Sequence, residues 1–285
     1  MIIDAHCHAW TYWPYEPPVP DPEHRGRVEQ LLWEMDQNGV DRALIVSAGI
    51  DHNPDNNAYI ADSVAAHPDR LDQLADVDSS WTSTHHQAGA AARLREIAAR
   101  RPIKGLTHYV EPANDGWFRS SEGVAFFEAA AELDLIASLS ASPAWQEDIR
   151  AIARRFPTLP ILCHHLAGLR ADEQPPFEGL REVLRSAALP NILVKVSGYY
   201  YASDRAWDFP FSDTMPIVRT LFEHFGPQRL CWGSDYPVVR RAMTYTQALE
   251  IIRTHCSWLS EADRGWILGG TLERVLHTRR PVDVG

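Results

Sequence analysis

The sequence lacks the features that would assign the protein to a secreted, membrane-embedded or nucleic-acid-binding class. Its four cysteines form no Cys-x-x-Cys pair and no signal peptide is recognisable, so a reduced cytoplasmic setting is predicted. No apolar run approaches the roughly 18 residues of a membrane-spanning helix. The formal net charge of −11 argues against nucleic acid or an anionic membrane as the main partner.

Nucleotide-binding motifs are absent as well. The sequence contains neither a glycine-rich dinucleotide fingerprint nor a phosphate-binding loop, and it has no low-complexity tail or short repeat. The 285 residues are 45% hydrophobic and 23% charged, which suits a globular protein of two small domains or one α/β barrel. An anionic small substrate stays possible, because local cations or a metal ion set the potential inside a site.

What the sequence does contain is a regular alternation of short apolar segments with amphipathic ones. Eight strands are predicted, at residues 2–7, 42–46, 71–77, 103–109, 136–139, 161–163, 192–196 and 230–232. Helices are predicted at residues 28–38, from 56 or 57 to before 68, at 85–100, 122–133, from 142 onward, at 177–186, 215–225, 245–255, 261–268 and 272–276.

This alternation predicts the fold class. Short apolar strands separated by helices imply a parallel sheet that is covered on its faces. Eight such units favour a closed (β/α)8 TIM barrel, a single domain over residues 1–285, rather than an open doubly wound sheet. In a closed barrel the last strand lies beside the first, and barrel enzymes place their sites at the C-terminal strand ends.

Two histidines one residue apart, His6 and His8, end the first predicted strand. Side chains alternate along a strand, so Asp4, His6 and His8 are expected on one face, where two imidazoles can bind one metal ion. Barrel closure would bring Asp235, which follows the last strand, beside them, as a metal ligand and general base. The structural alternatives are buried core histidines and an Asx turn at the aspartate.

Other polar side chains fall in or just after predicted strands. His108 ends residues 103–109 and is a candidate for substrate contact or catalysis. Of His164 and His165, which follow residues 161–163, one is expected to face the barrel axis while the other turns away. Lys195 lies within an apolar strand and needs a partner there, either an acid in the barrel or a substrate carboxylate.

The remaining candidates lie in loops or at the opposite end of the barrel. Aromatic residues gather after the first, fourth and seventh strands, which indicates an aromatic-walled pocket, loop packing or the interface of a homo-oligomer. Arg240 and Arg241 follow the last strand and are either an anion-binding pair or solvated surface residues. Lys104 is expected at the barrel bottom, where it could cap the strands.

With these residues in view, the chain resembles the amidohydrolase superfamily, in its amidohydrolase-related branch of metal-dependent barrels. That branch includes sugar-acid lactonases, pyrone-dicarboxylate lactonase and decarboxylases of aromatic acids. The resemblance rests on residues 3–8, 57–70, 104–108, 165–166, 195–198 and 233–237. It implies a divalent metal, usually zinc, held by His6, His8 and Asp235. It also implies that His165 polarises or protonates the substrate.

Two positions depart from the pattern of the branch. Metal-bearing relatives have a further histidine ligand in the fifth strand, whereas residues 136–140 here contain none, and some lactonases of this branch work without metal. Thr107 stands where sugar-lactonase relatives tend to have arginine.

The leading interpretation is a hydrolase that opens a lactone or a similar cyclic ester. Asp235 would take the proton from water, while His6, His8 and His165, with or without a divalent metal, would polarise the carbonyl. The first alternative is a metal-dependent non-oxidative decarboxylase of an aromatic or unsaturated carboxylic acid, and a non-catalytic ligand-binding barrel is the second. Each interpretation implies a small-molecule partner, possibly anionic or aromatic.

Overall fold

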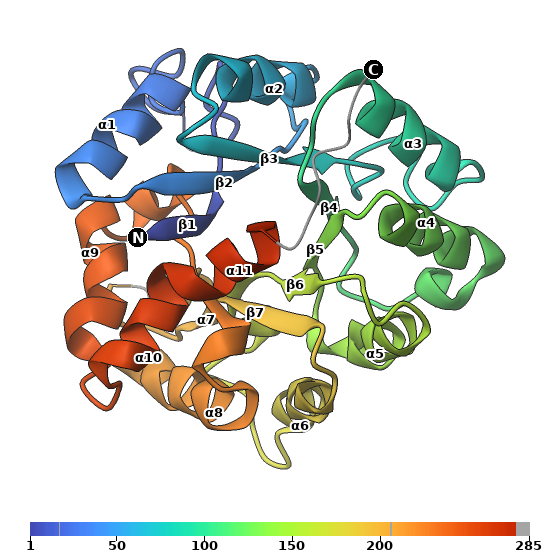
Figure 1. Ribbon diagram of the computed structural model, residues 1–285. Helices are drawn as coiled ribbons and strands as arrows, with labels where there is room; N and C mark the ends of the chain where they lie inside the picture. Colours follow the sequence, from blue (N-terminus) through green and yellow to red (C-terminus); the bar gives the residue numbers. More distant parts are fainter. Residues whose placement is uncertain (17, 206, 278–285) are drawn as a thin grey trace.

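The computed structural model describes residues 1–16, 18–205 and 207–277. Eight parallel strands, hydrogen-bonded in chain order, curl into a nearly closed barrel that is surrounded by helices (Figure 1). The strands are β1 (Ile3–Cys7), β2 (Arg42–Val46), β3 (Leu71–Asp76), β4 (Gly105–Tyr109), β5 (Ile136–Ser140), β6 (Ile161–Cys163), β7 (Ile192–Val196) and β8 (Leu230–Trp232). The predicted TIM barrel is therefore confirmed.

The α-helices follow the strands as the sequence pattern predicts, with a few shifted ends and one short unpredicted helix at residues 199–202. They are α1 (Val28–Asn38), α2 (Asn56–Ala66), α3 (Ala90–Arg100), α4 (Ser121–Glu132), α5 (Gln146–Arg155), α6 (Glu178–Arg185), α7 (Tyr199–Ala202), α8 (Met215–Phe225), α9 (Tyr245–Glu250), α10 (Glu261–Gly265) and α11 (Thr271–His277). Within the described ranges, no helix combines the length and the apolar character needed to cross a membrane.

The helix predicted from residue 85 begins at Ala90 instead. His86 has φ 53° and Gly89 has φ 87°, both in the left-handed region, which an α-helix does not contain. Residues 77–89 therefore form a loop between β3 and α3, and this loop carries His85 and His86.

The barrel has an inner and an outer core layer, and α11 covers its N-terminal end. Inward-facing side chains of the strands pack with Leu272, Val275 and Leu276 of α11, which lies across the N-terminal end of the barrel (Figure 1). Outward-facing side chains pack against the surrounding helices. All four cysteines are free and buried, as expected for inert thiols. The C-terminal end of the barrel is thus the end available for a site.

Strand β1 does not alternate regularly, because its register with β2 shifts between Asp4 and Cys7. A β-bulge of this kind adds a residue and reverses the face of those that follow. Asp4 therefore points outward, where its Oδ2 accepts hydrogen bonds from Ser234 Oγ at 2.5 Å and from the Tyr245 hydroxyl of α9 at 3.0 Å. The prediction that Asp4 shares a face with His6 and His8 is wrong.

Candidate active site

The C-terminal ends of β1 and β8 bring His6, His8 and Asp235 together. Nε2 of His6 lies 3.2 Å from Nε2 of His8, and these two atoms lie 3.4 and 3.6 Å from Oδ1 of Asp235. All three side chains are buried. Barrel closure therefore gathers the three residues that the sequence analysis named as a candidate metal and base group.

The backbone around Asp235 explains this close approach. The amide of Asp235 donates to the carbonyl of His6 at 2.7 Å, and the amide of His8 donates to the carbonyl of Tyr236 at 2.6 Å. Asp235 itself has φ 60°, a left-handed conformation that aspartate and asparagine tolerate better than most residues. A Cβ at Gly233 would lie 2.6 Å from Cβ of His6, so glycine is needed where the two strand ends meet.

Both histidines after β6 contact this group. The rings of His164 and His165 lie 4.5 and 4.4 Å from that of His6, centroid to centroid. The prediction that one of them turns away is wrong, because His165 has φ 42° and begins a 3-10 turn (His165–Gly168), where strand alternation no longer applies. Nε2 of His165 lies 3.9 Å from Oδ1 of Asp235, whereas Nε2 of His164 lies 2.7 Å from the hydroxyl of Ser138 in β5.

Lys195 of β7 lies beneath the histidines and is fully buried. Its Nζ is 3.3 Å from Nδ1 of His6. No salt bridge joins it to a carboxylate among residues 1–16, 18–205 and 207–277, so the expected acidic partner is not found there. Burial lowers the pKa of Lys195 to about 7. Near neutral pH this side chain is thus present both as ammonium and as neutral amine, next to the imidazole that faces Asp235.

The protonation states in the group suit a base and its electrophilic surroundings. Burial alone would raise the pKa of Asp235, but the neighbouring His165 and His8 and the hydroxyl of Tyr200 outweigh it and hold this pKa below its ordinary value. The Tyr200 hydroxyl donates to Oδ2 of Asp235 at 2.5 Å. Burial lowers the pKa of His165 to about 4 and that of His6 well below its ordinary value. Near neutral pH the group therefore holds a carboxylate together with neutral His6 and His165.

His108 is not brought to this group. Its ring points outward from β4, 5.4 Å from that of Phe126 in α4, and its Nε2 lies 3.2 Å from that of His86. Alternation along β4 places Thr107 and Tyr109 inside the barrel, so the face shared by Leu106 and His108 is the outer one. The expectation that His108 contacts substrate is therefore corrected, and it belongs to a separate cluster.

A pocket of about 400 Å³ opens beside His164 and His165. Tyr109, Tyr201 and Arg170 are among its lining residues. The ring of Tyr201 lies 5.1 Å from that of His165, and the guanidinium of Arg170 bonds Asp172 at 2.9 Å and the carbonyl of Tyr201 at 3.0 Å. Neither Tyr109 nor Arg170 was predicted as a site residue. Alternation from Thr107 could have indicated Tyr109, whereas no pattern marked Arg170.

The other basic candidates lie outside this pocket. Arg240 and Arg241 are exposed, and the guanidinium of Arg241 lies 5.9 Å from the ring centroid of Tyr15. Lys104 precedes β4, at the N-terminal end of the barrel, as expected. Trp10, from the loop after β1, is buried and stacks on His8 with centroids 4.8 Å apart. Neither Arg240 nor Arg241 lines the pocket, so neither can hold an anionic group of a substrate bound there.

The donor set of His6, His8 and Asp235 fits a zinc ion. Bonds of about 2.0–2.2 Å in tetrahedral geometry place two ligand atoms roughly 3.3–3.6 Å apart, close to the separations of 3.2, 3.4 and 3.6 Å found here. Nδ1 of His8 donates to the carbonyl of Val46 at 2.7 Å, which turns the lone pair of Nε2 toward the group, as in known zinc sites. Strand β5 contains no histidine. Its Ser138 bonds His164, whereas metal-bearing relatives were expected to have a further histidine ligand in this strand.

This chain is similar to known proteins in sequence and in fold. The chain is 28% identical over 257 residues to an L-fucono-1,5-lactonase of Burkholderia ambifaria, covering 84% of this chain and 81% of that protein. It is 25% identical over 244 residues to a 4-sulfomuconolactone hydrolase of Rhizobium radiobacter, covering 82% of this chain and 75% of that protein. A solved amidohydrolase from Burkholderia multivorans, with bound zinc, superposes with a TM-score of 0.77 at 21% identity, over 97% of this chain and 99% of that one.

A family model supports the same assignment over almost the entire chain. Residues 3–278 match the model described as Amidohydrolase. The resemblance inferred from the motifs, and with it the prediction of an amidohydrolase-family enzyme, is confirmed. This chain belongs to the amidohydrolase family.

Proposed function

We propose that the protein hydrolyses a lactone, with Asp235 as the general base. The observation that carries this proposal is the convergence of three imidazole nitrogens on one carboxylate oxygen. Nε2 of His6, His8 and His165 lies 3.4, 3.6 and 3.9 Å from Oδ1 of Asp235. The similarity to two hydrolases of lactones supports a cyclic ester as the bond that is cleaved.

In this mechanism Asp235 accepts a proton from the attacking water. Its Oδ2 is engaged by the Tyr200 hydroxyl at 2.5 Å, which leaves Oδ1 to face the imidazoles. As water adds to the lactone carbonyl, the proton passes to Asp235 and then to the ring oxygen that leaves, and a hydroxy acid is formed. His165 lies at the pocket, where it can donate a hydrogen bond to the carbonyl oxygen as negative charge develops there.

A zinc ion would be held by His6, His8 and Asp235, whose separations fit it. When bound, it supplies a Lewis acid for the lactone carbonyl. Nζ of Lys195 lies 3.3 Å from Nδ1 of His6, and with a pKa of about 7 its protonated form adds positive potential beside the metal ligands. This arrangement is compatible with activity in the absence of a fifth-strand histidine.

The pocket beside His164 and His165 supports a small, polar substrate class. A volume of about 400 Å³ suits a molecule of the size of a sugar lactone. The hydroxyl group of Ser140 offers a partner for a substrate hydroxyl, and the rings of Tyr109 and Tyr201 supply flat walls. Arg170 is the cation of this lining and would favour a lactone that carries a carboxylate or sulfonate group.

The test is hydrolysis of a set of lactones with product analysis. Purified protein is incubated with L-fucono-1,5-lactone, other sugar-acid 1,5-lactones and 4-sulfomuconolactone, and acid release is followed with a pH indicator. Mass spectrometry then identifies the product of addition of one water. Aromatic carboxylic acids are assayed in parallel for carbon dioxide, the product that a decarboxylase would release.

The decisive variant is Asp235→Asn, because asparagine keeps the left-handed backbone while it removes the base. We expect kcat/KM to fall by about 10²–10⁴-fold. Asp134→Asn is the matched control, since Asp134 is exposed and has φ 54°. Full activity in Asp235→Asn would exclude this aspartate as the base. Carbon dioxide release without any lactone opening would overturn the proposal in favour of decarboxylation.

A further inference from the structure

A second group of three histidines lies on the outer side of the barrel wall. His85 and His86 come from the loop between β3 and α3, and His108 comes from β4. One ring nitrogen of each lies within 4.8 Å of those of the other two. His108 is fully buried, while His85 and His86 are half-buried, so the group can be reached from solvent. These residues take no part in the proposed hydrolysis, and they do not belong to the group of His6, His8 and Asp235.

In all three rings Nδ1 faces an atom that can only accept a hydrogen bond. Nδ1 of His85 lies 2.8 Å from the carbonyl oxygen of Asp78, and Nδ1 of His108 lies 2.8 Å from that of Val77. Nδ1 of His86 lies 2.6 Å from Oδ2 of Asp115. Each Nδ1 therefore carries its proton, and each neutral ring has its lone pair on Nε2.

The consequence is most direct for His86 and His108, whose Nε2 atoms are 3.2 Å apart. Two lone pairs at this distance repel each other unless a proton or a cation lies between them. Burial lowers the pKa of His108 to about 3, and burial also lowers that of His86, so an added proton is disfavoured. Neutral imidazole is the form that ligates metals.

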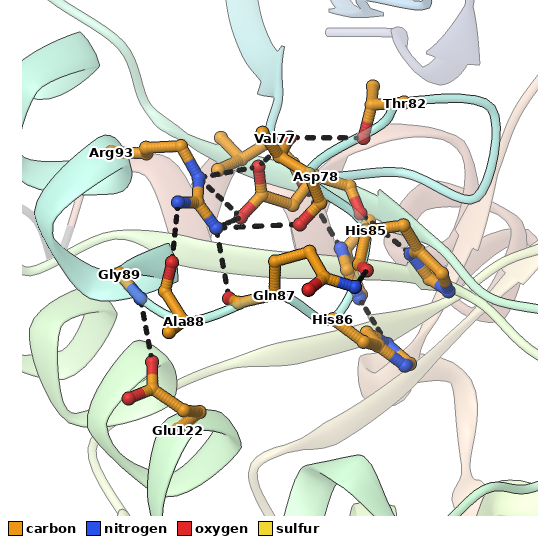
Figure 2. Close-up of polar contacts among 12 residues, drawn as sticks. Val77, Asp78, Thr82, His85, His86, Gln87, Ala88, Gly89, Arg93 and Glu122 are labelled. Carbon is orange, nitrogen blue, oxygen red and sulfur yellow. Dashed lines mark hydrogen bonds and ion pairs between the residues drawn. The ribbon is translucent and has the colours of Figure 1, made fainter.

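The loop that carries two of these histidines is held firmly in place (Figure 2). The guanidinium of Arg93 bonds both carboxylate oxygens of Asp78, with its Nε 2.9 Å from each, and also the carbonyl of Ala88 at 2.8 Å. The amide of Gly89 donates to Glu122 of α4 at 2.9 Å. The loop geometry is thus set before any ligand arrives, which lowers the entropic cost of binding.

We propose that His85, His86 and His108 bind one transition-metal ion of the zinc class through their Nε2 atoms, at a site separate from the proposed active site. Imidazole ligands suit zinc, cobalt, nickel and copper. Histidine ligands of metals typically donate their second ring N–H to a carboxylate or a backbone carbonyl, as all three do here. The ion would join the loop before α3 to β4, and through Asp115 to the loop after β4. Tyr109, the neighbour of His108, lines the pocket, so the ion would also steady this wall.

The test counts zinc ions in a protein whose metal-competent groups around His6 have been disabled. Tag-free protein carrying His6→Gln and Asp235→Asn, which removes a ligand from both metal-competent groups that contain His6, is stripped of metal, titrated with Zn²⁺ against a chromophoric chelator, and measured by elemental analysis after gel filtration. We expect about one zinc per chain to remain in this background, and a tetrahedral Co²⁺ absorption band when Co²⁺ replaces Zn²⁺. Adding His86→Gln removes both, whereas adding His67→Gln, at an exposed histidine, removes neither.

A graded variant tests the orienting carboxylate. Asp115→Asn is expected to weaken zinc affinity by about 10–100-fold, as changes to partners of metal-bound histidines typically do. Circular dichroism checks the fold of each variant, and His85→Gln takes the place of His86→Gln should the latter not fold. The proposal is overturned if the background binds no zinc, or if zinc is retained when His86 or His85 is replaced. Its failure leaves the lactone proposal intact, because the two sites are assayed separately.

Discussion

The backbone amide of Asp235 donates to the carbonyl of His6 at 2.7 Å, and Oδ1 of the same aspartate lies 3.4 Å from Nε2 of that histidine. Two residues from opposite ends of the chain are thus joined through both backbone and side chain. This double connection closes the barrel at its C-terminal end and assembles the proposed base with its imidazole neighbour.

The first prediction concerns the close packing at Gly233. In Gly233→Ala the new Cβ would lie 2.6 Å from Cβ and 2.9 Å from the backbone nitrogen of His6, so β1 and β8 must move apart. We expect a loss of about 1–3 kcal/mol in the free energy of unfolding, typical of overpacking, and a larger relative loss of lactone turnover. Urea denaturation and kcat/KM measure the two effects.

Gly265→Ala is the matched control for this substitution. Gly265 lies in a helix with φ −57°, and a Cβ there meets no atom within 4 Å. Alanine should therefore be neutral or stabilise the helix by about 0.5–1 kcal/mol. Equal stability and activity of the two alanine variants would contradict the role assigned to Gly233.

The second prediction concerns the hydrogen bond from Tyr200 to Asp235. Tyr200→Phe removes a donor to the carboxylate, so the pKa of Asp235 rises and its charged form is lost at a higher pH than in the parent protein. A hydrogen bond to a charged group contributes about 1.5–3 kcal/mol, which corresponds to a shift of roughly one to two pH units. The acid limb of the kcat/KM profile should move upward by this amount.

Tyr199→Phe serves as the control for the pH profile. Tyr199 belongs to the same helix, but its buried hydroxyl has no hydrogen-bond partner in the described part of the chain. The acid limb of this variant should coincide with that of the parent protein. An unchanged acid limb in Tyr200→Phe would show that Asp235 does not govern it.

The third prediction concerns the buried ammonium group of Lys195. Burial lowers its pKa from 10.5 to about 7, so between these values the unfolded chain holds a proton that the folded chain lacks. Folding then releases a proton, and the contribution of Lys195 to stability rises with pH by about 1.4 kcal/mol per unit. Below about pH 7 both states are protonated, and the burial penalty is constant and largest.

Lys195→Met removes this penalty while it preserves most of the side-chain volume. We expect the variant to be more stable than the parent protein by a few kcal/mol at pH 7, with a difference that shrinks toward pH 10. Urea denaturation from pH 6 to 10 measures it. Lys104→Met, at the only other lysine of the chain, is the control and should show no such trend. A constant difference for Lys195→Met would contradict the lowered pKa.

The architecture and the central site residues could be predicted from local patterns. Eight apolar segments separated by helices predicted the barrel. Closure of that barrel in turn predicted that His6, His8 and Asp235 lie close together. Closure follows from the number and order of the strands, which the hydrophobic periodicity indicates. The fit of these donors to zinc depends on distances that periodicity does not contain.

The incorrect predictions all concern the face of a strand on which a side chain lies. A bulge in β1 turns Asp4 outward, and left-handed backbone at His165 lets both His164 and His165 reach His6. Alternation along β4 was predicted correctly, but the face to which it assigns His108 was not. Strand alternation states which residues share a face. The contacts of the whole sheet decide which face is the inner one.

The order of the strands, the closed barrel and the meeting of its two ends follow from short-range hydrophobic patterns and chain topology, and so could be inferred from the sequence. Three contacts became visible only in the folded protein: Tyr200 bonds Asp235, Lys195 lies beneath His6 without an acidic partner in the described chain, and His85, His86 and His108 converge. These contacts join segments distant in sequence. Their geometry depends on register, bulges and loop torsions, which are stabilised only once the barrel has packed.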